Sequence, residues 1–177
     1  MPEPADDAPV VTAIHIAPGR RLPMRAVDAV EAEAGAGLVG DRYHGSRHRH
    51  VTVQSAEQLA EGAARLGSEV PPAGTRRNVT LSHGRVPARP GEQLRLGPVL
   101  LEVVRIAAPC RILDDEIAPG AAAALHDRAG TVFRVVEGGR IALGDSAVAL
   151  RSDPAEAAER AAASRIAASA PPRPRLP

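Results

Sequence analysis

The sequence contains no lysine and no tryptophan, and its only aromatic side chains besides histidine are Tyr43 and Phe133. Without a lysine amine, no Schiff base can form on a side chain, so pyridoxal phosphate bound covalently as an imine is excluded. Two aromatic rings also provide no stacking platform for single-stranded nucleic acid. We therefore expect no nucleic-acid partner, and a core built from valine, leucine, isoleucine and alanine.

Cysteine is nearly absent as well, since Cys110 is the only one among 177 residues. A single thiol cannot form an intramolecular disulfide or hold an iron–sulfur cluster, and it fits a reducing compartment. No apolar run approaches the ~20 residues needed to span a bilayer, and the first residues lack the basic and apolar segments of a signal peptide. A net charge of +1 provides no general attraction to nucleic acid or an acidic partner. These features predict a cytoplasmic protein without a membrane partner.

Short apolar segments separated by glycine and proline dominate the chain and predict about eight strands. The expected strands and hairpins span residues 10–16, 25–33, 50–54, 77–82, 92–104, 131–136, 140–143 and 146–150. A capping box of Ser55 and Gln58 predicts a helix that ends near Leu66 with Gly67, and residues 111–129 can form one or two short helices. The pattern favours a mainly β barrel or sandwich with a few short helices over a doubly wound α/β sheet.

The two ends of the chain differ in character from this middle part. Residues 1–9 are acidic and rich in proline, which is typical of a disordered segment. Asp153 and Pro154 are typical of a helix start, and an alanine-rich stretch follows them before a proline–arginine tail. We therefore expect a disordered N-terminus at 1–9, a folded domain at 10–150, and an alanine-rich helix with its tail at 151–177.

Cys110 follows an apolar, β-branched run and Pro109, which ends the expected strand. An unpaired cysteine is often a small buried hydrophobic residue. Alternatively, backbone N–H groups of the following turn and the neighbouring Arg111 would favour a thiolate, the form that attacks sulfur or binds a metal. The position of Cys110 by itself leaves both interpretations open.

A glycine-rich loop at residues 37–45, G-L-V-G-D-R-Y-H-G, contains Gly40, Asp41, Arg42 and His44. Its glycines allow the backbone to approach a ligand closely, and Asp41 can hold Arg42 or a backbone turn. Arginines and histidines follow densely up to residue 50, which indicates an anion or phosphate site. An ordinary solvated basic loop is the alternative.

The same stretch contains His44, His48 and His50, a spacing that permits a zinc site. No regular helix or strand places all three on one side, so we favour anion binding over zinc. Farther along the chain, Arg76, Arg77 and Asn78 stand at the start of an expected strand. Two guanidinium groups and an amide form a suitable clamp for an anionic ligand, although each alone is an unremarkable surface residue.

Six motifs, taken in order, resemble those of the MOSC domain, named for the C-terminal domain of molybdenum cofactor sulfurase. They are G-L-V-G-D-R-Y-H-G, H-V-T-V, G-T-R-R-N-V-T-L, G-E-Q-L-R-L-G, A-P-C-R-I-L and V-F-R-V-V-E-G-G-R-I-A-L-G-D. The resemblance covers about residues 10–150 and is strongest to short stand-alone bacterial members. It implies a MOSC-type β-barrel in which Cys110 is the functional thiol, either as a molybdenum ligand or as a persulfide carrier.

The resemblance also implies a pocket for the molybdenum cofactor (molybdopterin), because arginines suit the phosphate of a pterin cofactor and a thiolate suits molybdenum. The residues that we expect to contact this cofactor are Gly40, Asp41, Arg42, His44, Arg76, Arg77, Asn78 and Arg111, with Cys110 as the metal ligand.

Three functions are compatible with this resemblance. The leading hypothesis is an enzyme that reduces N-hydroxylated small molecules on the cofactor, with a separate electron donor because no flavin, haem or iron–sulfur site is expected. The second is a sulfur carrier, in which a separate cysteine desulfurase supplies a persulfide to Cys110. The third is a non-catalytic cofactor-binding module, in which the arginines matter and Cys110 does not.

Overall fold

The computed structural model describes residues 7–150. The expected alanine-rich helix and tail at 151–177, and most of the N-terminal segment expected to be disordered, lie outside the described residues. The strands are β1 (Val11–Ile16), β2 (Arg25–Val27), β3 (Ala29–Glu33), β4 (Gly37–Leu38), β5 (Val51–Ser55), β6 (Val79–Leu81), β7 (Gln93–Leu96), β8 (Val99–Ile106), β9 (Thr131–Glu137), β10 (Gly139–Ala142) and β11 (Ala147–Leu150). The helices are α1 (Ala56–Leu66), the 3-10 helix η1 (Pro72–Thr75), α2 (Arg111–Glu116) and α3 (Ala121–Ala124).

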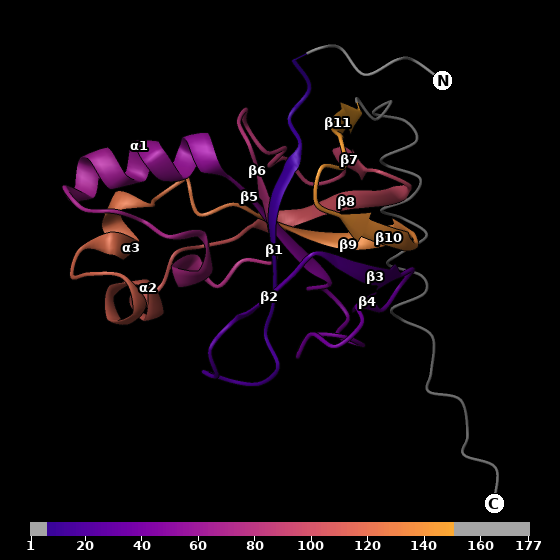
Figure 1. The fold of residues 1–177 in the computed structure, drawn as a ribbon, viewed down its shortest axis with the longest axis horizontal. Helices are drawn as coiled ribbons and strands as arrows, with labels where there is room; N and C mark the ends of the chain where they lie inside the picture. The colour runs from indigo at the N-terminus through magenta and orange to yellow at the C-terminus, as the bar shows by residue number, and fades with distance from the viewer. Residues whose placement is uncertain (1–6, 151–177) are drawn as a thin grey trace, which may run out of the picture.

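Eight of the strands form one sheet in the order β11-β7-β8-β9-β5-β6-β1-β2, and β10, β3 and β4 form a second. Neighbouring strands pair antiparallel except β5 and β6, which are parallel and are joined through α1 and η1. A parallel pair requires such a crossover, because the chain must return to the same end of the sheet. The α-helices α1, α2 and α3 gather at one end of the molecule and the smaller sheet lies at the other (Figure 1).

The mainly β fold is confirmed, and within the described part of the chain the strand ladders do not close into a barrel. The larger sheet nevertheless curls back on itself. The N–H of Val11 donates to the carbonyl of Asp145 at 2.9 Å, and Val10 forms a single β-bridge with Ser146. These contacts bring the start of β1 against the start of β11, so the two regions of the sheet that are distant in strand order meet.

The core is aliphatic, as the scarcity of aromatic residues predicts. One cluster of buried side chains lies between the sheets and contains Phe133, Leu101 and Ile141. A second, smaller cluster lies beneath the helices and contains Leu59, Leu113 and Leu125. No helix of the described residues is long and apolar enough to cross a membrane.

Two local predictions were wrong. The expected single strand 25–33 is broken at Asp28, because β2 pairs with β1 whereas β3 pairs with β10 in the other sheet. The capping box is also absent: Ser55 occupies the N-cap position, but its hydroxyl is fully buried in the sheet and has no hydrogen-bond partner among residues 7–150. The prediction for the C-terminal end of α1 is confirmed, since Gly67 ends this helix in the left-handed conformation with φ 75°.

Candidate functional site

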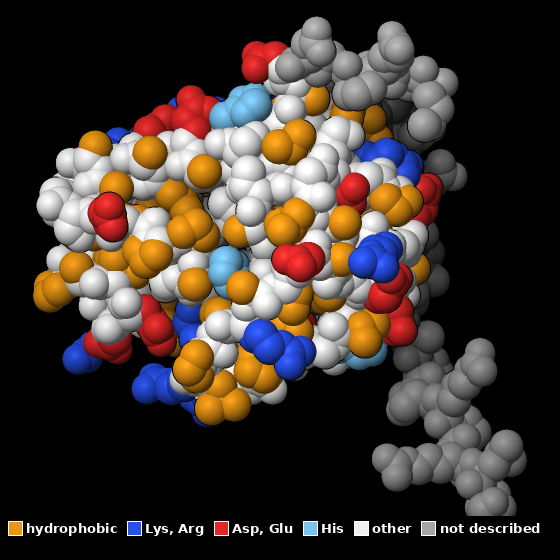
Figure 2. All heavy atoms as spheres, in the orientation of Figure 1, with side chains coloured by type: hydrophobic (Ala, Val, Ile, Leu, Met, Phe, Trp, Pro, Cys, Tyr) orange, Lys and Arg blue, Asp and Glu red, His pale blue; other side chains and the backbone are white. Residues whose placement is uncertain are grey.

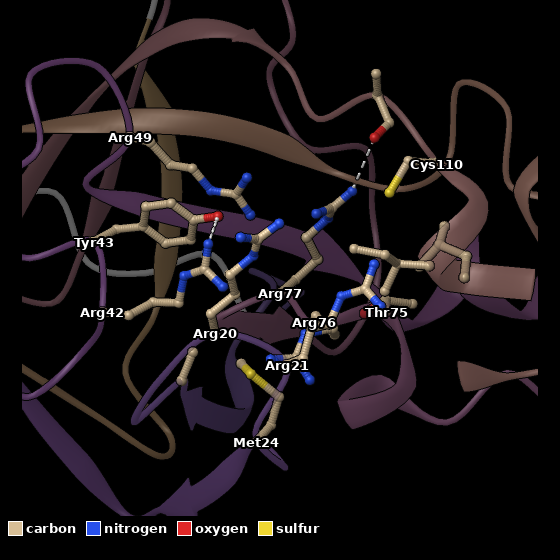
Figure 3. Close-up of a pocket in the computed structure, with 14 residues that line it drawn as sticks. Arg20, Arg21, Met24, Arg42, Tyr43, Arg49, Thr75, Arg76, Arg77 and Cys110 are labelled. Atoms are coloured by element: carbon tan, nitrogen blue, oxygen red, sulfur yellow. Dashed lines mark hydrogen bonds between the residues drawn. The ribbon is translucent and has the colours of Figure 1, made fainter. Parts of the chain in front are cut away.

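A cavity of about 260 Å³ lies where the loops between several strands meet α2. Its walls come from the β1–β2 loop, the glycine-rich loop, the approach to β5, the end of η1 and the turn after β8. The lining residues are Ala17, Arg20, Arg21, Met24, Arg42, Tyr43, Arg49, Thr75, Arg76, Arg77, Ala108, Cys110, Ile112 and Leu113 (Figure 3).

Six of these lining residues are arginines, and among the described residues no Asp or Glu lines the cavity. So many guanidinium groups around one small space create a positive potential that attracts anions. Arginine also offers several N–H donors in a fixed plane, which match the oxygens of a phosphate or carboxylate. Basic side chains are visible at the lower edge of the molecule near α2 and the β1–β2 loop (Figure 2). The geometry and charge together make this cavity suited to an anionic ligand.

Asp41 fixes the shape of the glycine-rich loop from beneath. Its buried carboxylate accepts hydrogen bonds from the N–H of Ala17 at 2.8 Å and from the N–H of Tyr43 at 3.0 Å. A third bond, also 3.0 Å long, comes from the side-chain amide of Asn78. Because the loop is tied to the end of β1 in this way, the side chains of the next two residues extend into the cavity.

Asn78 is buried and satisfies all of its side-chain hydrogen-bonding capacity within the fold. Its oxygen accepts from the N–H of Thr52 at 3.0 Å and from the Thr52 hydroxyl at 2.9 Å. Its amide donates to the carbonyl of His15 at 3.1 Å and to Asp41 at 3.0 Å. Asn78 therefore joins β1, β5 and the glycine-rich loop, and neither it nor Asp41 is among the lining residues.

Arg77 holds the turn that carries Cys110. Its buried guanidinium donates to the carbonyl of Ala129 at 2.7 Å, and more weakly to those of Ala107 at 3.3 Å and Ala108 at 3.4 Å. Burial, and to a lesser extent the nearby Arg49, lower the pKa of Arg77 to about 10, whereas Cys110 acts in the opposite direction. Arg77 thus lies close enough to Cys110 for the two side chains to interact electrostatically.

Cys110 is exposed, so its interpretation as a buried hydrophobic residue is wrong. It occupies the N-cap position of α2, where its carbonyl accepts a hydrogen bond from the N–H of Leu113 at 2.9 Å. The neighbouring Arg111, expected to contact the cofactor, is exposed and does not line the cavity. Cys110 thus borders an arginine-rich space and is accessible to a ligand there.

Tyr43 lies between two arginines. The guanidinium carbons of Arg49 and Arg42 stand 4.1 and 4.4 Å from the centre of its ring, and Arg42 also donates to its hydroxyl at 2.8 Å. Figure 3 shows Arg49 above the ring and Arg42 below it. Cation–π contacts of this kind hold both side chains in place at little entropic cost. The only tyrosine of the chain therefore positions two of the cavity's cations.

Two buried arginine nitrogens at the cavity have no hydrogen-bond partner among residues 7–150. They are Nε of Arg49 and Nη2 of Arg76, whose other contact is an ion pair with Glu116 at 3.7 Å. Burial also lowers the pKa of Arg49. An unsatisfied buried donor on a cation costs free energy, and an anionic ligand would remove that cost. Arg76 moreover has φ 59°, an uncommon backbone conformation that clusters at functional sites.

The histidines do not assemble into a metal site. His44 forms an exposed ion pair with Glu33 at 2.8 Å, outside the cavity lining. His50 is buried, where its Nε2 bonds to the carbonyl of Ser46 at 2.8 Å and its Nδ1 accepts from the N–H of Val135 at 3.0 Å. In residues 7–150, no three His, Cys, Asp or Glu side chains lie close enough to hold a metal ion. The zinc alternative is wrong for this part of the chain.

Of the residues expected to contact a cofactor, the structure brings Arg42, Arg76, Arg77 and Cys110 together at the cavity. Gly40 supplies a turn with φ 86° at the edge of the loop. The other ten of the fourteen lining residues were not among the expected cofactor contacts, and Arg20, Arg21, Met24 and Tyr43 are four of them. The only available signal for the first two was the R-R pair that follows the turn at Pro18 and Gly19, directly after β1.

Several solved structures have a similar fold. YuaD from Bacillus subtilis superposes with a TM-score of 0.69 at 17% identity, over 79% of this chain and 94% of its own. YiiM from Geobacillus stearothermophilus gives a TM-score of 0.64 at 17% identity, over 81% of this chain and 75% of its own. YiiM from Escherichia coli gives a TM-score of 0.61 at 18% identity, over 81% of this chain and 71% of its own. At such low identity these similarities show the fold alone.

No curated protein matches the sequence. The sequence model of the MOSC domain, however, matches residues 40–148, which include Arg77, Cys110 and the glycine-rich loop from Gly40 onward. This match covers more than half of the chain and agrees with the fold. The protein therefore belongs to the MOSC domain family.

Proposed function

We propose that this protein binds the molybdenum cofactor in the arginine-lined cavity, with Cys110 as the thiolate ligand of the metal, and reduces N-hydroxylated compounds there. The proposal starts from the family, because the MOSC domain is associated with the molybdenum cofactor. The observation that carries the proposal is a pair of buried guanidinium nitrogens, on Arg49 and Arg76, that have no hydrogen-bond partner in the described part of the chain and belong to the same cavity as the exposed thiol.

The residues present fit this cofactor. Arg49 and Arg76 would bind the phosphate of the pterin, because their free N–H groups are what a phosphate oxygen requires. The Cys110 thiolate is a soft ligand of the type that suits molybdenum. When bound, the cofactor supplies a metal centre that accepts and donates electrons in pairs.

The protein's own contribution is to bind and orient. Arg77 fixes the turn before Cys110 through three backbone carbonyls and provides a cation beside the thiol. Tyr43 holds Arg42 and Arg49 in place. In the net reaction the N–O bond of the substrate breaks, two electrons and two protons are taken up, and an amine and water leave. A separate redox protein would supply the electrons.

The test is a measurement of molybdenum per chain in protein purified from a host that makes the cofactor. We expect close to one molybdenum atom per chain in the wild type, and a strong loss in Cys110→Ser and in Arg49→Gln/Arg76→Gln. Arg25→Gln is the matched control, since Arg25 is exposed and does not line the cavity. Metal-free wild-type protein that gains neither metal nor activity on reconstitution would refute the proposal.

The exposure of Cys110 favours a second candidate function, transport of sulfur as a persulfide. The Cys110 thiolate would attack the outer sulfur of a desulfurase persulfide, forming a new S–S bond while the desulfurase cysteine leaves as a thiolate. Mass spectrometry after incubation with a cysteine desulfurase and free cysteine should then show one added sulfur in the wild type and none in Cys110→Ala. If the wild type also gains no sulfur, this candidate fails.

A further inference from the structure

Arg20 and Arg21 differ from the other four arginines of the cavity. Arg77 bonds to carbonyls, Arg76 pairs with Glu116, and Arg42 and Arg49 stack on Tyr43. Among the described residues, Arg20 and Arg21 are the lining arginines whose side chains form no hydrogen bond, ion pair or ring contact. Both are exposed, whereas Arg77 is buried.

The loop that carries these two arginines is nevertheless shaped by the fold. Arg21 adopts φ 58°, an uncommon conformation for a residue with a side chain. Leu22 packs closely over Gly19, where an added Cβ would stand 2.8 Å from the Leu22 Cδ1 atom. The two guanidinium groups are therefore presented from a folded turn at one side of the cavity, next to Met24 (Figure 3).

Held and free arginines suit different ligands. Guanidinium groups fixed by protein contacts are already arranged for a resident group, so little ordering cost remains when that group binds. Exposed cations without partners instead attract a ligand that arrives from solvent and leaves again, and they raise its association rate. In the proposed function, the arginines held by protein contacts bind the phosphate of the cofactor. Arg20 and Arg21 are then available for a ligand that exchanges with solvent.

We infer that Arg20 and Arg21 recognise a phosphate-like anionic group on the substrate, so that this protein prefers N-hydroxylated compounds that carry such a group. This inference rests on the proposed function. Two adjacent guanidinium groups match a doubly charged group better than a neutral substrate end, since each can donate two N–H bonds to oxygen.

The test compares two aromatic amidoximes that differ only in a phosphonate group at the far end of the ring. Both are assayed with molybdenum-loaded protein and a reduced viologen dye as the electron donor. We expect kcat/KM for the phosphonate compound to exceed that for the neutral one by about tenfold or more, the gain of one to two exposed charged contacts. In Arg20→Gln/Arg21→Gln this ratio should fall to within about twofold of unity, whereas Arg25→Gln should keep it.

Two further measurements separate this inference from the proposed function. Calorimetric titration of the phosphonate compound into oxidised, non-reacting protein should show weaker binding to the double variant than to the wild type, by a factor similar to the fall in the kcat/KM ratio. The molybdenum content of that variant should match the wild type. A wild type that reduces both compounds equally, or a double variant that loses its molybdenum, would overturn the inference and leave the proposed function standing. If molybdenum-loaded wild type reduces neither compound, both fail.

Discussion

Replacing Arg77 by methionine tests whether the Arg77 guanidinium holds the turn before Cys110 through its hydrogen bonds to backbone carbonyls. The substitution keeps most of the apolar stem and removes the donors to Ala129 at 2.7 Å, Ala107 at 3.3 Å and Ala108 at 3.4 Å. A hydrogen bond to a charged group contributes about 1.5–3 kcal/mol, and the two long bonds fall at or below the lower limit. The sum of the three would be about 5 kcal/mol.

The net loss should be smaller than this sum, because the cation itself is costly to bury. Its pKa of about 10 reflects that cost. We therefore expect Arg77→Met to lower the free energy of unfolding by about 2–3 kcal/mol in urea denaturation, mainly through the unpaired carbonyl of Ala129. Arg65→Met, at an exposed position in the last turn of α1, is the matched control and should cost less than about 0.5 kcal/mol.

Hydrogen exchange provides the local readout. The N–H of Ala107 bonds to the carbonyl of Gly130 at 2.9 Å and joins the same two segments that Arg77 bridges. Its exchange should accelerate in Arg77→Met by more than the global loss of stability explains. Unchanged unfolding in urea together with unchanged exchange at Ala107 would refute the claim that Arg77 holds this turn.

Three further predictions concern single residues. Cys110→Ala should abolish reduction of N-hydroxylated compounds but change the free energy of unfolding by less than about 0.5 kcal/mol, because the thiol is exposed. Retained reductase activity would contradict the role of Cys110 as the metal ligand. Gly130→Ala should lower the free energy of unfolding by more than about 3 kcal/mol, because the added Cβ would stand 2.3 Å from the carbonyl oxygen of Val53 and the residue has φ 89°. Gly45→Ala is the control: its φ is 82°, and no atom of residues 7–150 lies within 4 Å of the added Cβ. It should therefore show only the conformational cost of about 1 kcal/mol. Burial lowers the pKa of His50 and also that of His15, so the unfolded state binds more protons just below pH ~6.5 and the free energy of unfolding should fall as pH drops from there. Each histidine contributes at most about 1.4 kcal/mol per pH unit, and the slope should be smaller in His50→Gln than in the wild type; an unchanged slope would contradict the contribution of His50.

Local sequence signals predicted most elements, because their causes are local. Short apolar segments between turn residues identified strands such as β1 and β9, and Gly67 marked the end of α1. Where a prediction failed, a distant segment decided the outcome. The break at Asp28 exists because β3 pairs with β10, more than a hundred residues away in the chain. Ser55 fails to cap α1 because its side chain is enclosed by the sheet.

The candidate site shows the same division. Motif order pointed to Cys110, Arg42 and Arg77, and the structure places all three at one cavity. Spacing alone could not separate a lining residue from a supporting one: Asn78 is adjacent to Arg77 but joins three segments within the fold. Arg20 and Arg21 carried no motif, and only the path of the β1–β2 loop brings them to the cavity.

The sequence by itself determined the chemistry available to this protein: one thiol, twenty-two arginines, no lysine amine and an aliphatic core. It also determined the mainly β character, because strand periodicity and turn residues act over a few neighbours. The tertiary structure decided which arginines are held, which are free, and that Cys110 is exposed beside Arg77 rather than buried. These properties depend on contacts between residues far apart in the chain, and such contacts exist only once the sheet has curled and the loops have met.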